Sequence, residues 1–135
     1  MTTSAPGVTT GGYFTALAGA QFIVLTSYRA SGAPVPTTVW FAEAQGRLYI
    51  TTNAQLKKVG RIRANPQVTV AASDRVGNIQ GPAIDARARV LDAAEFETAA
   101  TALREKYGEQ YITMTAQMDA AQAPNSRIFL EVTPP

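Results

Sequence analysis

The amino-acid sequence predicts a mainly β, α+β fold in which six antiparallel strands form a closed or partly closed barrel with short flanking helices. The first observation is a set of six short segments with the composition or the alternation of β-strands. The second is that only short turns separate the first three segments, which is typical of an antiparallel meander. The third is a physical constraint, because an open sheet leaves two unpaired edges that closure into a barrel removes.

The six predicted strands follow one another along the chain with turns or helices between them. In the second strand, Pro36 must lie at a sheet edge or near the strand start, because proline cannot donate a ladder hydrogen bond. In the fifth strand, Ile84 and Ala86 alternate with Asp85 and Arg87, so one face is expected to be buried and the other polar. The predicted ranges are 20–28, 35–44, 47–52, 67–73, 83–92 and 126–132.

A short amphipathic helix is predicted directly after the third strand. Leu56, Val59 and Ile62 recur every third residue as an apolar stripe, and the Asn-Pro pair at 65–66 ends the helix. The same stretch, "TTNAQLKKVGRIRANP", has four cations within seven residues, although charged residues make up only 16% of the chain. We expect the first three of them on the side opposite the apolar stripe. The four cations are Lys57, Lys58, Arg61 and Arg63.

This basic cluster has two interpretations of about equal weight. Cations in the first turn of a helix are unfavourable beside the positive end of the helix dipole, so Lys57 and Lys58 indicate a partner anion. The first-turn N–H groups also favour an anion there, and Arg61 follows one turn later, so a phosphate is one candidate. The alternative is a solvated charged face, which is common on surface helices.

A second helix is predicted from its end signals and its apolar face. Asp92 and Glu95 have the spacing of a capping box, and Gly108 is a typical C-terminal stop. Residues 109–125 are ambiguous between a short helix and a turn region. The apolar face of the second helix consists of Phe96, Ala99, Ala100, Leu103 and Tyr107.

The composition excludes several classes of chemistry. The 135 residues include no cysteine and no histidine, which excludes disulfides, thiolate zinc sites, histidine-dependent triads and histidine-ligated haem, and we expect no metal. A net charge of +2 disfavours a nucleic-acid-binding barrel built on the arginines of the first helix and the fifth strand. We expect one cytoplasmic domain over 13–135 after a flexible tail over 1–12, because no signal peptide and no membrane-spanning run is present.

Further stretches have a functional interpretation, but ordinary packing is favoured for each. "PVPTTVW" places threonine hydroxyls beside Trp40, which suits the edge and face of a planar ring, yet threonine is also common in strands. "GNIQGP" could approach a ligand through Gly77 and Gly81, although a hairpin connection explains it as well. Most tyrosine hydroxyls are expected in the core or at an interface. They belong to Tyr28, Tyr49, Tyr107 and Tyr111.

Four stretches in order resemble the FMN-binding split-barrel superfamily of pyridoxamine 5′-phosphate oxidase-like proteins. They are "VLTSYRASGAPVPTTVWF", "RLYITTNAQLKKVGRIRANPQVTVAA", "GNIQGPAIDARARVL" and "ALREKYG". The second stretch fits the oxidase spacing, in which Thr52-Asn53 is followed after five residues by Lys58 and after seven more by an Asn-Pro pair. Within the superfamily the chain is most similar to the short actinobacterial branch that uses the deazaflavin coenzyme F-420.

The resemblance implies a homodimer of split barrels with a cofactor in each of two clefts at the interface. It implies an oxidoreductase that transfers a hydride between coenzyme F-420 and a small conjugated organic substrate, and it names no catalytic residue. FMN-dependent oxidoreduction and a non-catalytic flavin- or deazaflavin-binding module are the alternatives. The residues that match cofactor-binding positions are Val35, Pro36, Thr37, Thr38, Ile50, Thr51, Thr52, Lys57, Lys58 and Arg61.

Two departures from the family pattern leave FMN and F-420 both open. Leu56 stands where the oxidases usually carry a serine, and "NAQLK" replaces the Gly/Ser-rich run that often precedes the lysine in the F-420 branch. Pyridoxamine phosphate oxidation itself is not expected, because those enzymes use substrate-phosphate Arg and His groups and this chain has no histidine.

Overall fold

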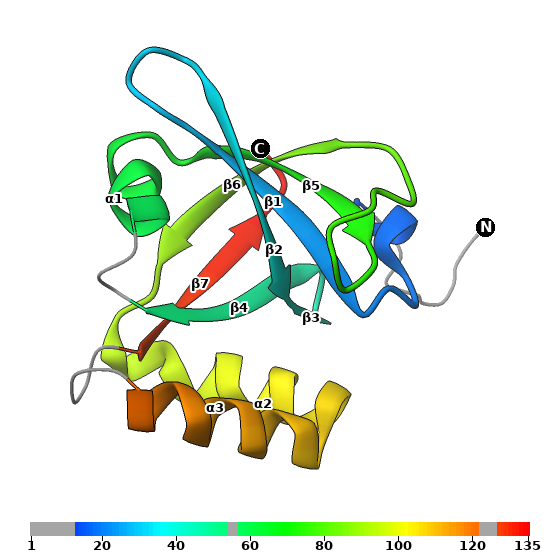
Figure 1. Cartoon of the computed structure of the whole chain (residues 1–135), viewed down its shortest axis with the longest axis vertical. Coiled ribbons are helices and arrows are strands. Elements are labelled where there is room, and N and C mark those ends of the chain that lie inside the picture. Colours follow the sequence, from blue (N-terminus) through cyan, green and yellow to red (C-terminus); the bar gives the residue numbers. More distant parts are fainter. Residues whose placement is uncertain (1–12, 54–56, 122–126) are drawn as a thin grey trace.

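The computed structural model describes residues 13–53, 57–121 and 127–135 (Figure 1). Its seven strands form one antiparallel sheet in the order β2-β1-β5-β6-β7-β4-β3, which confirms the predicted mainly β fold. The predicted tail over 1–12, and Leu56 of the predicted apolar stripe, lie outside the described residues. The strands are β1 (Phe22–Tyr28), β2 (Pro34–Trp40), β3 (Ala42–Ala44), β4 (Arg47–Asn53), β5 (Gln67–Ser73), β6 (Ile84–Val90) and β7 (Arg127–Thr133).

The structure has seven strands instead of the predicted six because the second predicted strand is interrupted at Phe41. Its first part, β2, pairs with β1, and its second part, β3, pairs with β4. Both predicted meander pairings therefore exist, but different parts of one segment make them. Because β2 and β3 are the two ends of the sheet order, this bent segment lies at both edges of the curled sheet.

The interruption at Phe41 is held by the end of the second helix. The Tyr107 hydroxyl accepts a hydrogen bond from the Phe41 N–H (3.1 Å) and lies 2.8 Å from the Phe41 carbonyl oxygen. The Lys106 ammonium donates to the same carbonyl (2.8 Å) and lies 3.5 Å from the centroid of the Phe41 ring. The backbone polar groups that leave the ladder at the bend are thus satisfied by side chains.

The described part of the chain has three α-helices, and they lie on different sides of the sheet. α1 (Lys57–Ala64) contacts β1 and β6, whereas α2 (Phe96–Tyr107) packs on β3, β4 and β7, with α3 (Glu109–Ala121) beside it (Figure 1). The ambiguous region after Gly108 is therefore helical as far as Ala121. No helix among the described residues is long and apolar enough to span a bilayer.

The end signals of α2 are confirmed with one difference in detail. Asp92 and Glu95 form the predicted capping box, but the box opens a short 3-10 turn, η3 (Ala93–Glu95), and the α-helix starts at Phe96. Gly108 ends the helix with a positive φ of 58°, the conformation that favours glycine.

Two apolar clusters stabilise the sheet from its two faces. The first includes Ile23, Leu25, Ile50 and Leu130 from the barrel strands, together with Ile62 from α1. The second lies between the outer face of β4 and β7 and the helices. It is formed by Ala42, Tyr49, Leu91, Ala99, Ala100, Ala102, Leu103, Tyr107, Tyr111 and Phe129.

Candidate anion-binding site

Val59 and Ile62 of the basic helix α1 are buried, which confirms these two members of its apolar stripe, and Ile62 belongs to the barrel cluster. The prediction that Lys58 lies opposite the stripe is wrong, because only 8% of Lys58 is exposed. In an α-helix, Ile62 projects about 40° to one side of Lys58 and Arg61 about 60° to the other, so Lys58 lies within the buried arc. Lys57 is exposed and faces solvent.

The Lys58 ammonium is buried, and it has no partner of opposite charge in the part of the chain that the structure describes. None of the ion pairs in the described ranges includes a residue of α1, and no hydrogen-bond acceptor of the ammonium is present there. Burial, together with the neighbouring Arg61 charge, lowers the pKa of Lys58 from 10.5 to about 8. A buried cation beside a second cation is unfavourable unless an anion binds to it.

Arg61 is positioned by a serine on the neighbouring strand. Its Nε donates a hydrogen bond of 2.8 Å to Ser27 Oγ, and Ser27 on β1 is 1% exposed. Ser27 lies directly opposite Val35 of β2, so their side chains share a face of the sheet. Ser27 therefore links Arg61 to the face of β2 that carries Val35, and Lys58 lies close enough to Arg61 for the two charges to repel each other.

The remaining predicted residues of β2 divide between the two faces of the strand. Thr37 shares the face of Val35, because it lies opposite the core residue Leu25, whereas Pro36 and Thr38 point to the other face. Gly77 of the β5–β6 loop covers this second face at Thr38. A Cβ added to Gly77 would lie 2.8 Å from Thr38 Oγ1. The loop at Gly77 therefore approaches β2 closely, whereas the sequence had suggested a close approach to a ligand.

The predicted residues of β4 also divide. Ile50 is buried in the barrel cluster, and its side chain is not available to a ligand, while Thr52 is buried and shares its face. Thr51 points to the α3 side, where its hydroxyl donates to the Ile128 carbonyl (3.0 Å) and accepts from Arg127 (3.4 Å). Thr51 therefore belongs to a different polar cluster from the one around Lys58.

Sequence reasoning missed Ser27 as a site residue. A signal was present, because in a strand with period two Ile23, Leu25 and Ser27 share one face, and a serine at a buried position needs a hydrogen-bond partner. The partner itself was not visible, since it comes from a helix 34 residues further along the chain.

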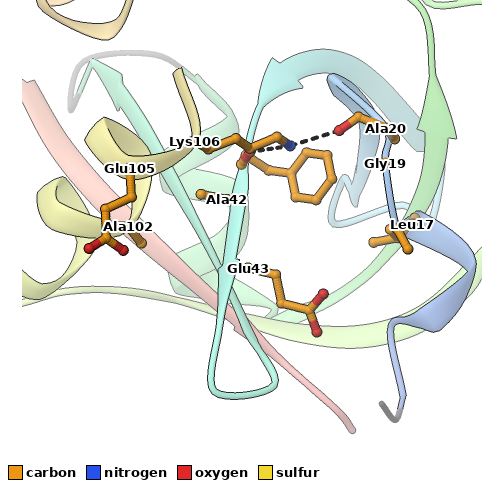
Figure 2. Close-up of a pocket in the computed structure, with 10 residues that line it drawn as sticks. Leu17, Gly19, Ala20, Ala42, Glu43, Ala102, Glu105 and Lys106 are labelled. Carbon is orange, nitrogen blue, oxygen red and sulfur yellow. Dashed lines mark hydrogen bonds between the residues drawn. The ribbon is translucent and has the colours of Figure 1, made fainter. Parts of the chain in front are cut away.

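A recess lies at the bend of β2 and β3, and none of its lining residues belongs to α1 (Figure 2). It has a volume of about 330 Å³, and Lys106 lies in its wall with Glu43 nearby. The Lys106 ammonium donates to the Ala20 (2.7 Å) and Phe41 (2.8 Å) carbonyls, and burial lowers its pKa to about 8. These contacts give Lys106 a structural role at the bend, where it satisfies backbone carbonyls.

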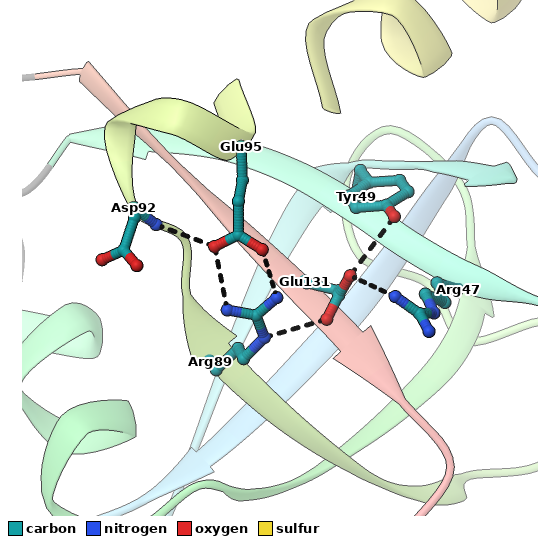
Figure 3. Close-up of polar contacts among 6 residues, drawn as sticks. All are labelled: Arg47, Tyr49, Arg89, Asp92, Glu95 and Glu131. Atoms are coloured by element: carbon teal, nitrogen blue, oxygen red, sulfur yellow. Dashed lines mark hydrogen bonds and ion pairs between the residues drawn. The ribbon is translucent and has the colours of Figure 1, made fainter. Parts of the chain in front are cut away.

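A second polar cluster centres on the buried carboxylate of Glu131 (Figure 3). Glu131 accepts hydrogen bonds from Arg89 (3.0 Å), Arg47 (3.3 Å) and the Tyr49 hydroxyl (3.2 Å). Arg89 also pairs with Glu95 at 2.6 Å. Arg89 therefore donates hydrogen bonds to two carboxylates. Few of its donors remain for the nucleic-acid contact that we considered.

The lowered pKa of Lys58 predicts a pH dependence of the ligand-free protein. Between about pH 8 and pH 10.5 the lysine is protonated in the unfolded chain but largely neutral in the folded one, so the free energy of unfolding rises with pH. The contribution of one such group is at most about 1.4 kcal/mol per pH unit. Lys106 contributes in the same sense, so Lys58→Met should reduce the slope without abolishing it.

This dependence is measured by urea unfolding between pH 7.5 and 9.5. The range stops there because the raised pKa of Tyr107, about 12, acts in the opposite sense at higher pH. An unchanged slope in the Lys58→Met protein would show that Lys58 titrates as an ordinary exposed lysine.

The comparisons with known proteins agree with this fold. The profile of the pyridoxamine 5′-phosphate oxidase family matches residues 12–135, and no curated protein matches the sequence. One similar solved structure is an F-420 reductase, with 22% identity and a TM-score of 0.55, over 93% of this chain and 94% of that chain. An FAD-binding protein from Mesorhizobium loti has 17% identity and a TM-score of 0.60, over 89% and 83%.

A third similar structure is the heme storage protein HutZ from Vibrio cholerae, with 17% identity and a TM-score of 0.65, over 87% of this chain and 83% of that chain. At these identities the structural likenesses establish the fold alone. The family profile covers almost the whole chain, and with the strand order it confirms the resemblance to the FMN-binding split-barrel superfamily. The chain therefore belongs to the pyridoxamine 5′-phosphate oxidase family.

Proposed function

We propose that the protein is an oxidoreductase that binds a phosphorylated flavin or deazaflavin, with coenzyme F-420 as the first candidate and FMN as the alternative. The observation that supports this is the buried ammonium of Lys58 beside Arg61, which has no partner among the described residues. Two neighbouring cations that form no ion pair within the described parts of the chain are suited to a phosphate, which both cofactors carry.

The residues around Lys58 fit a phosphate better than the rest of the predicted site does. Lys58 is the principal phosphate ligand in this proposal, and Arg61, fixed through its Nε, has its terminal amines available. Lys57 is exposed at the start of α1 and can assist from solvent. Val35 and Thr37, on the same face as Ser27, would then lie beside the ring system.

The bound cofactor would supply the two-electron redox chemistry, and the protein would bind, orient and shield it. A small conjugated organic compound is the substrate class that we propose with F-420. Without histidine, protons would come from a tyrosine or from water. The proposal includes a homodimer, because β2 pairs only with β1 within the described sheet, so that its other edge is free to adjoin a second copy.

A titration that follows the fluorescence of Trp40, the only tryptophan, tests the proposal. Trp40 ends β2, on the face opposite to Val35 and Thr37, and flavins and deazaflavins absorb light in the range where tryptophan emits. A ring system bound along β2 should therefore quench Trp40 by energy transfer, which does not require both groups to lie on the same face. We expect saturable quenching by F-420 at micromolar concentration. Saturation by FMN alone would favour an FMN-dependent reductase or oxidase.

Riboflavin, which lacks the phosphate, is the control in this titration. We expect it to bind at least about tenfold more weakly than FMN, the minimum expected for losing a charge-assisted contact. If neither F-420 nor FMN quenches Trp40 at micromolar concentration, the proposed function is wrong.

A non-catalytic binding module is the second candidate. It has support from one similar structure, HutZ, which is described as a heme storage protein. A storage or carrier protein would bind the cofactor but would not change its redox state with any acceptor. Steady-state assays with a panel of conjugated acceptors distinguish the two candidates once the cofactor is known.

A further inference from the structure

The buried serine of β1 is the feature that the proposed function leaves unexplained. Ser27 is 1% exposed, and its hydroxyl oxygen accepts the Arg61 Nε–H at 2.8 Å. A hydroxyl group also has one proton to donate. In the described parts of the chain no acceptor receives it, so this buried donor lacks a partner on the protein side.

Three kinds of donor on α1 and β1 thus lack an acceptor among the described residues. They are the Lys58 ammonium, the terminal amines of the Arg61 guanidinium and the Ser27 hydroxyl, and none has a carboxylate or carbonyl partner among the described residues. Buried donors are normally satisfied, and leaving one unpaired costs about 1–3 kcal/mol. A set that contains only donors is complementary to an oxyanion with several acceptor atoms.

The position of Ser27 makes it suitable for two tasks. Arg61 lies on a short helix, and an unrestrained arginine side chain adopts many rotamers. The bond to Ser27 restrains the guanidinium through Nε, which leaves the two terminal amines to face a ligand as a pair. Since Ser27 lies opposite Val35, the restrained group is also next to the strand proposed to line the ring.

We infer that Ser27 is a third donor of the anion site and the positioning residue of Arg61, and that it selects the phosphorylated form of the ligand. This inference rests on the proposed function for the identity of the ligand. Ser27 donates its proton to a phosphate oxygen and accepts from Arg61 at the same time. Ligands without the phosphate gain nothing from it.

The test compares FMN with riboflavin, or F-420 with its deazaflavin chromophore lacking the phosphate arm, in wild-type and Ser27→Ala proteins. We expect Ser27→Ala to weaken binding of the phosphorylated form about tenfold and to leave the unphosphorylated form unchanged, as for one hydrogen bond to a charged group. Ser27→Thr, which keeps the hydroxyl, should restore at least part of the preference. Thr26→Val is the matched control, because it removes a hydroxyl from the opposite face of the same strand.

A double-mutant cycle separates positioning from direct donation. Arg61→Lys keeps the charge but removes the Nε donor, so the effect of Ser27→Ala should shrink in that background to the part due to the Ser27 proton. A purely structural role would instead lower the urea-unfolding stability and weaken both ligand forms equally. That result, or an unchanged preference for phosphate in Ser27→Ala, would overturn the inference while the proposed function stands.

If neither cofactor binds the wild-type protein, inorganic phosphate takes the place of the ligand. We then expect millimolar phosphate to raise the melting temperature of the wild-type protein and of Thr26→Val, with a clearly smaller rise for Ser27→Ala and Ser27→Thr in between. The absence of any phosphate-dependent rise in the wild-type protein would overturn the anion site altogether.

Discussion

Replacing Lys58 with methionine is expected to weaken cofactor binding by roughly 10- to 100-fold, as for the loss of a charge-assisted contact to phosphate. The same substitution should stabilise the ligand-free protein by about 1–2 kcal/mol, because methionine fills similar space without a buried, unpaired charge. The two effects have opposite signs, and fluorescence titration together with urea unfolding measures both.

Arg63→Met is the matched control for this prediction. Arg63 is also a cation of α1, but it is exposed, so its loss should change cofactor affinity and the free energy of unfolding only slightly. A Lys58→Met protein that is less stable and still binds the cofactor normally would show that the lysine is a structural residue. Equal losses of affinity in both variants would indicate a general electrostatic attraction.

Replacing Tyr107 with phenylalanine is expected to lower the free energy of unfolding by about 2–3 kcal/mol, because buried backbone groups lose their partner. The Tyr107 hydroxyl accepts the Phe41 N–H and lies within bonding distance of the Gln21 and Phe41 carbonyls at the β2–β3 bend. Burial raises the pKa of Tyr107 to about 12, so the hydroxyl stays protonated at ordinary pH. Urea unfolding at pH 7 measures the loss.

Tyr13→Phe provides the control for the hydroxyl at the bend. Tyr13 is half exposed, and its hydroxyl donates to the Asp85 carbonyl at 2.6 Å, so water can replace that bond at small cost. The interpretation of the bend would be wrong if the Tyr107→Phe and Tyr13→Phe proteins lost the same stability. Lys106 also donates to the Phe41 carbonyl, so this carbonyl keeps one hydrogen bond in the Tyr107→Phe protein and the loss of stability is limited.

The bend and the anion site are linked by one strand. β2 starts beside the Ser27–Arg61 pair and ends at the interruption that Tyr107 and Lys106 hold. A change at the bend can therefore alter where Val35 lies relative to Lys58. We expect Tyr107→Phe to weaken cofactor binding less than Lys58→Met does, since it removes no ligand of the phosphate.

Elements governed by local interactions were predictable from the sequence. The alternation of β6, the capping box at Asp92 and Glu95, and the stop at Gly108 all depend on residues within a few positions of one another. The family resemblance was equally available, because Thr52, Lys58 and the Asn-Pro pair have a fixed spacing along the chain. These features determined the fold class and the helix on which the candidate site is built.

Only the tertiary structure decided which of the basic residues are buried and what they contact. Periodicity shows which residues share a face of a helix, but it does not show how much of the helix surface the barrel covers. The burial of Lys58 could therefore not be predicted from the sequence. The pairing of Arg61 with Ser27, and the bend that α2 holds at Phe41, join segments far apart in the chain. Such contacts depend on strand register and packing, which no local pattern contains.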